Sequence, residues 1–376
     1  MVAPRASPTA ENPAAEVQVS AGASLVSQPS APDPLSEIEA DSSGSNSDTE
    51  SVRSIVDSAF SASGENSGDD TSSVKSHIFK YQYENGRRYH AYREGQYLQP
   101  NDEKEQERLD MVHHWYRLTL RGALFRAPIL KYPQKVLDIG TGTGKLSSLL
   151  RLIDKPLLMV TGIWAIEFGD EFPSADVIGT DLSAIQPAWV PPNVQFIIDD
   201  AELEWTYAPN SFDFIHARTL GGSIKDFPKL LRQAYRTLKP GGWIEFDEFE
   251  SWLKSDDGTL KDDSAISEWQ TLMDQASTKF GRRLNIAETI EPMLKAAGFV
   301  DVVDDIYKNP MNPWPRDRRL KELGAWGNLA MVEGIEAISL ALFTRVLEWD
   351  RAAVEVILAR VRKELSNREI HSYAAT

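Results

Sequence analysis

A run of glycines beside an acidic residue is the part of the sequence best suited to chemistry. Asp138 is followed by Gly140, Gly142 and Gly144, with one residue between successive glycines. Glycine lets the backbone approach a ligand closely and turn tightly into a following helix. In an open parallel sheet, such a loop lies beyond the carboxyl ends of the strands, where ligands bind. The run 138–144 therefore predicts a cofactor-binding loop.

The acid that precedes the glycines limits which cofactor this loop can hold. Asp138 would repel the pyrophosphate of a dinucleotide, which has to contact the backbone N–H groups of such a loop. S-Adenosylmethionine has no phosphate and carries an amino group and a sulfonium, so Asp138 suits it. This charge argument favours a methyltransferase over a nicotinamide-dependent enzyme, which stays as an alternative.

Acidic residues follow the next two expected strands. Asp181 ends the second, where a carboxylate can accept both ribose hydroxyls. Asp199 and Asp200 follow the third and offer a carboxylate to the adenine amino group, with Asp200 favoured. The residues expected to bind the cofactor are Asp138, Gly140, Thr141, Gly142, Gly144, Asp181, Leu182, Asp200 and Ala201.

Three further residues are candidates for the transfer step. Positioning can supply most of the acceleration of methyl transfer from an activated donor, so no base is obligatory. His216 could remove a proton from an acceptor, or hold a structural hydrogen bond under the cofactor, which is the interpretation favoured. Arg218 could orient an acidic acceptor or pair with a carboxylate. Tyr89, with His90 and Tyr92, could form a lid over the cofactor or a packed aromatic arm.

These residues need a parallel sheet to position them. Short apolar runs alternate with helix-length segments, which predicts an α/β fold with a mostly parallel sheet and helices on both faces. The expected strands are 136–139, 176–180, 194–198, 212–216 and 243–246, with 299–306 as a sixth. The expected helices are one that Asn101 caps and Pro128 ends, and those over 227–238, 263–280 and 317–364.

Residues 79–371 resemble the fungal LaeA-like group of class I methyltransferases, which is named for a regulator of secondary metabolism. The segments that carry the resemblance are 83–92, 136–144, 163–174, 177–183, 186–187, 190–194, 199–202 and 212–218. The resemblance implies a Rossmann-like fold of seven strands, with cofactor contacts at Gly140, Gly142, Gly144, Asp181 and Asp200. It implies no particular methyl acceptor, so a small molecule and a protein both stay open. A regulatory protein that keeps the fold, binds protein partners and needs little or no catalysis is the alternative.

The chain departs from this group directly after the glycine loop. In similar proteins the third glycine continues into a segment like Ile163-Trp-Ala-Ile166, whereas here residues 145–162 intervene. Removing these residues restores the usual spacing of about 20 residues between the loop and the ribose acid. One hypothesis is a retained intron. The alternative is a genuine insertion, in which 145–153 forms the helix after the loop and 155–172 bulges before the second strand.

A second departure lies at the C-terminus. Similar proteins continue past a stretch like 367–371 into a closing strand antiparallel to the sheet edge, whereas this chain stops at Thr376. We therefore expect a sheet of six strands with an unprotected edge.

Composition divides the chain into a tail and one domain. Residues 1–76 carry 12 acidic and 3 basic side chains and are rich in Ser, Ala and Pro, so a disordered tail is expected. Residues 77–376 form the expected methyltransferase domain. It comprises an arm and helix (77–130), a cofactor-binding core (135–250) and a helical and C-terminal part (251–376).

Composition also excludes several classes of function. The chain has no cysteine and a net charge of −16, so we expect no disulfide, no thiolate nucleophile and no direct nucleic-acid binding. His113 and His114 lack a third ligand nearby, so no metal site is expected. Neither a signal peptide nor a membrane-length apolar segment is present. These features predict an intracellular protein, cytoplasmic or nuclear, that does not bind membranes.

Overall fold

The computed structural model describes residues 26, 37–41, 81–90, 95, 97–142, 163–187 and 190–376. Most of the expected tail, Tyr92, Gly144 and the whole of 145–162 lie outside these ranges, so the expectations for them stay predictions. Within the described ranges, no helix combines the length and apolar content that a membrane span requires.

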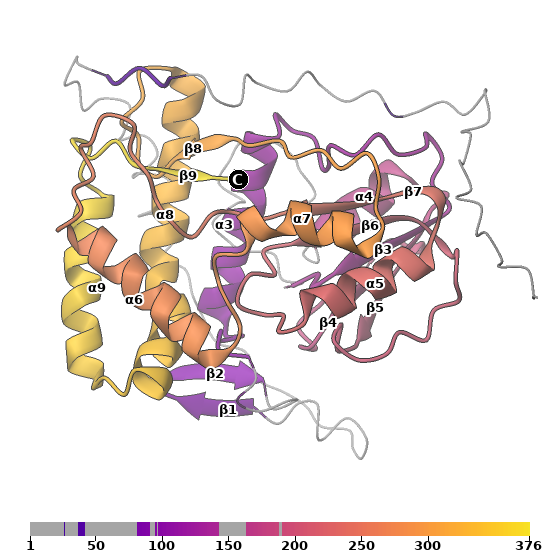
Figure 1. The fold of residues 1–376 in the computed structure, drawn as a ribbon, viewed down its shortest axis with the longest axis horizontal. Helices are drawn as coiled ribbons and strands as arrows, with labels where there is room; N and C mark the ends of the chain where they lie inside the picture. The colour runs from indigo at the N-terminus through magenta and orange to yellow at the C-terminus, as the bar shows by residue number, and fades with distance from the viewer. Residues whose placement is uncertain are drawn as a thin grey trace, which may run out of the picture.

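A parallel sheet forms the core of one half of the domain, on the right in Figure 1. Its five strands lie in the order β5-β4-β3-β6-β7, and every neighbouring pair is parallel. The strands are β3 (Lys135–Ile139), β4 (Asp176–Asp181), β5 (Val194–Ile198), β6 (Phe212–Arg218) and β7 (Leu238–Asp247). The five apolar runs named from the sequence thus all form strands, and the predicted mostly parallel sheet is confirmed.

Helices cover both faces of this sheet because its strands are apolar on both sides. On β3, Leu137 and Ile139 pack in one cluster with residues of α5 (Phe227–Thr237) and α7 (Ala287–Ala297). Val136, which points to the opposite face, packs in another cluster with residues of α4 (Ile163–Glu171). Both helical layers of the predicted fold are therefore present.

Helix α4 also bears on the interruption after the glycine loop. Residues 155–172 were expected to bulge if 145–162 is a genuine insertion. Within the described ranges, Ile163–Glu171 is instead a buried helix that contacts β4. Trp164 and Phe168 are almost fully buried in it. The expected bulge is wrong for these residues because their apolar side chains cover the sheet.

Helix α3 (Glu103–Thr119) differs from its prediction at both ends. The carboxylate of Asp102, and not Asn101, caps it by accepting the N–H of Glu105 at 3.0 Å. The same carboxylate accepts two hydrogen bonds from Arg87, at 2.6 and 2.9 Å. The helix ends at Leu120, well before Pro128, because Arg121 and Gly122 take positive φ angles of 54° and 88°.

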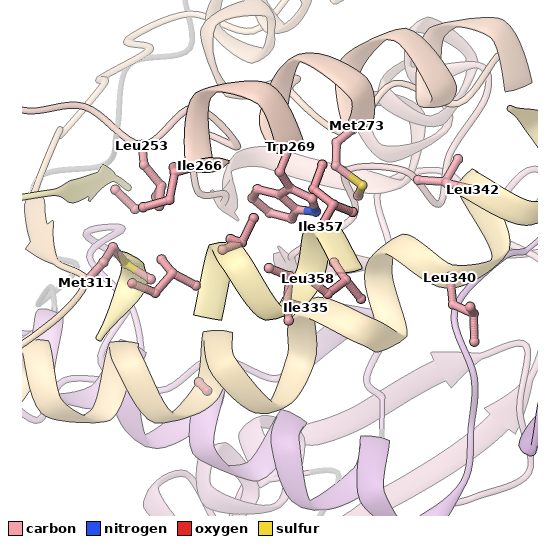
Figure 2. Close-up of a cluster of buried hydrophobic side chains, with 14 of the residues drawn as sticks. Leu253, Ile266, Trp269, Met273, Met311, Ile335, Leu340, Leu342, Ile357 and Leu358 are labelled. Atoms are coloured by element: carbon pink, nitrogen blue, oxygen red, sulfur yellow. The ribbon is translucent and has the colours of Figure 1, made fainter. Parts of the chain in front are cut away.

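A helical layer packs beside the sheet (Figure 1). It comprises α6 (Ala265–Phe280), α8 (Arg318–Ala341), the π-helical turn η2 (Leu342–Val346) and α9 (Arg351–Leu365), with α3 against α8. Figure 2 shows Trp269 and Met273 among the aliphatic side chains of this layer, and the Trp269 indole donates to Ser339 Oγ at 2.8 Å. The single helical stretch expected over 317–364 is broken because Glu348 takes a φ of 61° and Asp350 caps a new helix.

Two short strands replace the expected sixth strand. Residues 299–306 form no strand, and Asp301 within them has a φ of 52°. Instead, β8 (Lys308–Pro310) pairs antiparallel with β9 (Tyr373–Ala375), which also bridges Lys254. The C-terminal residues thus form a strand that was not expected. In the described chain it lies outside the five-stranded sheet, so β7 is an edge strand.

The remaining described residues pack around this frame. Strands β1 (Tyr81–Glu84) and β2 (Arg87–His90) form an antiparallel hairpin. Five residues of the expected tail, 37–41, lie against the start of α8. There the N–H of Arg316 donates to the Glu39 carbonyl at 2.8 Å, and Lys321 pairs with Asp41.

Candidate functional site

A cavity of about 230 Å³ lies where the carboxyl ends of the parallel strands meet the helical layer. Its wall on the sheet side comes from the segments that follow β3, β4, β5, β6 and β7. Its wall on the helical side is largely apolar. The latter includes Trp115, Leu253, Trp269, Met273, Met311, Met331 and Ile338.

The glycine loop after β3 forms one part of this wall through Gly140, Thr141 and Gly142. Gly140 and Gly142 have φ angles of 68° and 71°, which side chains rarely adopt. A Cβ atom on Gly140 would also stand 2.7 Å from a methyl carbon of Leu220. Both the turn and the close packing therefore require glycine at position 140.

Asp138 anchors this loop through a side chain that lies outside the described cavity lining. It is 2% exposed. One carboxylate oxygen accepts the Thr141 hydroxyl at 2.6 Å, and the other lies 2.7 Å from Nδ1 of His216. Asp138 thus fixes the loop and does not face the cavity, which differs from the expectation that its charge meets the cofactor.

His216 lies between two carboxylates, those of Asp138 and Asp247. The imidazole is 1% exposed, lies outside the described cavity lining and stacks on Trp164 with ring centroids 3.7 Å apart. Its Nε2 lies 3.2 Å from the carboxylate of Asp247. Burial lowers the pKa of His216, but the two carboxylates outweigh it and the net pKa is raised. The geometry favours the structural alternative for His216, because the ring is buried behind the described cavity lining and both of its nitrogens face carboxylates.

Asp181 and Asp200 both reach the cavity, each beside its expected neighbour, Leu182 and Ala201. The carboxylate of Asp181 accepts the N–H groups of Gly142 at 2.9 Å and Ser183 at 2.8 Å. Burial nevertheless raises the pKa of Asp181 to about 6. Asp200 is buried and accepts the N–H of Glu202 at 2.9 Å.

Arg218, the last residue of β6, lines the cavity and meets α3 there. Its guanidinium donates to Nδ1 of His113 at 3.1 Å and lies 5.1 Å from the ring centroid of Tyr116. Because arginine can only donate, Nδ1 of His113 is the acceptor, and the ring proton sits on Nε2, 3.2 Å from Glu167. Burial lowers the pKa of His113 to about 4, so the ring is neutral.

Tyr89 lies outside the described cavity lining. It is 3% exposed and packs in the helical layer beneath the guanidinium of Arg345. This placement favours the packed arm over the lid.

Sequence reasoning missed several cavity residues, among them His113, Tyr97 and Glu248. Glu248 follows β7 directly, and its carboxylate accepts the N–H groups of Leu220 and Gly221. Burial raises the pKa of Glu248 to about 8. Its position after a strand was a usable signal, whereas nothing local to α3 indicates that His113 faces the sheet.

Comparisons with known proteins agree with this geometry. Residues 111–303 match the family model described as a methyltransferase domain. Methyltransferase pytC of Aspergillus terreus is 42% identical over 301 residues, which cover 80% of this chain and 87% of that protein. Secondary metabolism regulator LAE1 of Cochliobolus heterostrophus is 39% identical over 296 residues, 77% of this chain and 91% of that protein. Protein-methionine methyltransferase laeA of Emericella nidulans is 35% identical over 300 residues, 78% of this chain and 74% of that protein.

Proposed function

Because the chain belongs to the methyltransferase family that includes the fungal LaeA-like secondary metabolism regulators, we propose that its cavity binds S-adenosylmethionine for transfer of the methyl group. One observation carries the assignment of the site. Gly140, Gly142, Asp181 and Asp200, from three different strand ends, line a single cavity at the carboxyl edge of the sheet. That edge is where ligands of open parallel sheets bind.

The charge of the cavity suits this cofactor. The segments after β4 and β5 place Asp181, Asp199, Asp200 and Glu202 in its wall. These carboxylates would repel a pyrophosphate, whereas S-adenosylmethionine has an amino group and a sulfonium and no phosphate. The acidic wall therefore argues against the nicotinamide-dependent alternative.

Each binding residue has a role that its contacts allow. Asp181 would accept the ribose hydroxyls with the lone pairs that its N–H partners leave free. Asp200 would face the adenine amino group. The loop at Gly140 and Gly142 lets the backbone approach the methionine part closely.

The reaction then depends on positioning. S-Adenosylmethionine supplies a methyl group already activated by the sulfonium. The apolar wall at Trp115, Leu253, Trp269 and Met273 would hold the acceptor and exclude water from the line of attack. The acceptor is a small molecule or a protein side chain. The Emericella nidulans relative is named for transfer to protein methionine, so a thioether is one acceptor to test.

Calorimetric titration with S-adenosylhomocysteine tests the binding site. We expect Asp181→Asn to weaken binding about 10- to 100-fold, since hydrogen bonds to a charged group contribute about 1.5–3 kcal/mol. Glu204→Gln is the control, because Glu204 has an 85% exposed side chain and is absent from the described cavity lining. Equal affinity in both variants, or tight binding of NAD by the wild type, would overturn the assignment.

A labelling experiment separates an enzyme from a regulator that only keeps the fold. Radiolabelled methyl groups from S-adenosylmethionine should enter components of a fungal extract, and Gly142→Arg should abolish this transfer. Cofactor binding without any transfer would favour the regulator.

A further inference from the structure

We propose that Arg218 binds a carboxylate inside the cavity, either that of the methionine part of the cofactor or that of an acidic acceptor. The proposal rests on the donor site proposed above and adds to it the chemical group that the cavity recognises beside the glycine loop. Its basis is a cation in the cavity wall that forms no ion pair with any described carboxylate.

The described cavity wall contains three arginines, and two of them are paired. Arg108 makes two hydrogen bonds to Glu105, at 2.9 and 2.7 Å. Arg282 contacts Glu202 at 2.6 Å. Arg218 forms no ion pair with any residue in the described ranges.

The groups that do contact Arg218 are uncharged. His113 is neutral because burial lowers its pKa to about 4. Tyr116 is neutral because burial raises the pKa of its phenol well above the usual value. The hydrogen bond to His113 and the contact with the Tyr116 ring hold the guanidinium in place. Neither contact places a carboxylate against the guanidinium, although its charge helps to lower the pKa of Glu167 on the far side of His113.

A carboxylate is the ligand that this arrangement lacks. A guanidinium has five N–H donors in a planar fork that matches a carboxylate, and the structure gives one hydrogen bond to His113. The guanidinium is partly buried, so an anionic ligand would gain more from this pairing than at the surface. The acidic groups elsewhere in the wall favour a singly charged ligand over a phosphate.

The position of Arg218 places both sources of a carboxylate within the same cavity. Strands β3 and β6 are neighbours, with Ile139 paired to Ala217, so Arg218 stands beside the start of the glycine loop. On its other side are His113 and Tyr116 of α3, which belongs to the helical layer that would hold the acceptor.

The experiment compares wild type, Arg218→Gln and Arg360→Gln by calorimetry. Arg360→Gln also removes one positive charge, but Arg360 lies on α9 in an exposed pair with Glu268 of α6, outside the described cavity lining. The first arm titrates S-adenosylhomocysteine and 5′-methylthioadenosine, which lacks the amino-acid part. The second titrates decanoate and decanamide into protein saturated with S-adenosylhomocysteine.

Two outcomes support the proposal. If Arg218 binds the cofactor, Arg218→Gln weakens S-adenosylhomocysteine at least 10-fold and leaves 5′-methylthioadenosine within 2-fold. If it binds the acceptor, S-adenosylhomocysteine is unchanged, whereas decanoate binds the wild type and not the variant, and decanamide binds both alike. Arg218→Lys should retain part of either effect, and thermal unfolding verifies that each variant is folded.

The proposal is overturned if Arg218→Gln binds S-adenosylhomocysteine like the wild type and decanoate binding either is absent or does not depend on Arg218. A wild type that fails to bind both S-adenosylhomocysteine and 5′-methylthioadenosine would instead refute the proposed function. The two failures are therefore distinguishable.

Discussion

Glu248 carries a buried carboxyl group that accepts the backbone N–H groups of Leu220 and Gly221. Burial raises its pKa from 4.5 to about 8. Between these two values the folded state holds a proton that the unfolded state releases. The free energy of unfolding contributed by Glu248 therefore falls as pH rises through this window.

Glu248→Gln should remove this pH dependence, because glutamine resembles the protonated carboxyl group. Urea unfolding at pH 5.5, 6.5 and 7.5 should give a shallower fall in stability for the variant, by up to about 1.4 kcal/mol per pH unit. Glu204→Gln serves as the exposed control. An unchanged slope in Glu248→Gln would show that the group is ionised throughout this range.

The residues of the site were partly predictable. Asp181 and Asp200 line the cavity because a parallel sheet brings the carboxyl ends of its strands to one edge, and the sequence marks those ends. Asp138 was identified too, but its side chain points away from the cavity to Thr141 and His216. The pattern along one strand could not show this, because the direction depends on the partner strand β6. His113 depends on how α3 packs, which is a contact distant in sequence.

Helix α8 shows how one element depends on a close backbone contact. A Cβ atom on Gly324 would stand 2.2 Å from the carbonyl oxygen of Asn312. The side-chain amide of Asn312 in turn donates to the carbonyls of Asn367 and Ile370, at 3.1 and 3.0 Å. Gly324 therefore lets α8 pack closely against Asn312, which in turn holds the residues that follow α9.

Gly324→Ala should lower the free energy of unfolding by about 1–3 kcal/mol through overpacking, despite the better helix propensity of alanine. Glu322→Ala, at an exposed position on the same helix, should change it by less than about 0.5 kcal/mol. Urea unfolding compares the two. If Gly324→Ala were as stable as the wild type, the backbone at Asn312 would have to move away from α8 without a cost in stability.

At this scale the interiors of elements were predictable and their ends were less so. Apolar runs identified the five strands because both faces of the sheet are buried. The break between α8 and α9 and the early end of α3 depend on single residues with positive φ, such as Glu348 and Arg121. Glu348 is not glycine, so no composition signal marked the break between α8 and α9, whereas Gly122 after α3 was a usable signal for the end of that helix. The family comparisons confirm the predicted methyltransferase class, and with it S-adenosylmethionine as the methyl donor.

At the scale of the whole molecule, the main question is whether the fold needs the segment 145–162. Gly142 and Ile163, on either side of it, both line the cavity, and Ile163 begins α4. If α4 is the helix that the glycine loop enters in similar proteins, a chain lacking 145–162 has a complete strand, loop and helix. We expect this deletion variant to unfold at a higher temperature and to bind S-adenosylhomocysteine at least as tightly as the full chain.

Sequencing of cDNA across the junction gives the matching genetic result. A dominant transcript without the corresponding 54 bases would support a retained intron in the gene model, whereas one that contains them would refute it. A deletion variant that fails to fold would show that 145–162 has a structural role of its own.

The stacking of Trp164 on His216 allows the protonation of His216 to be followed by tryptophan fluorescence. A protonated imidazole in contact with an indole quenches its fluorescence, and His216 keeps its proton to a higher pH than a histidine in water. We therefore expect Trp164 emission to be weak until His216 loses that proton and to rise afterwards. Trp115 and Trp269 line the cavity, so their emission responds to ligand entry. Light from the indoles would thus report both the protonation of the buried pair and the occupancy of the cavity, without any label.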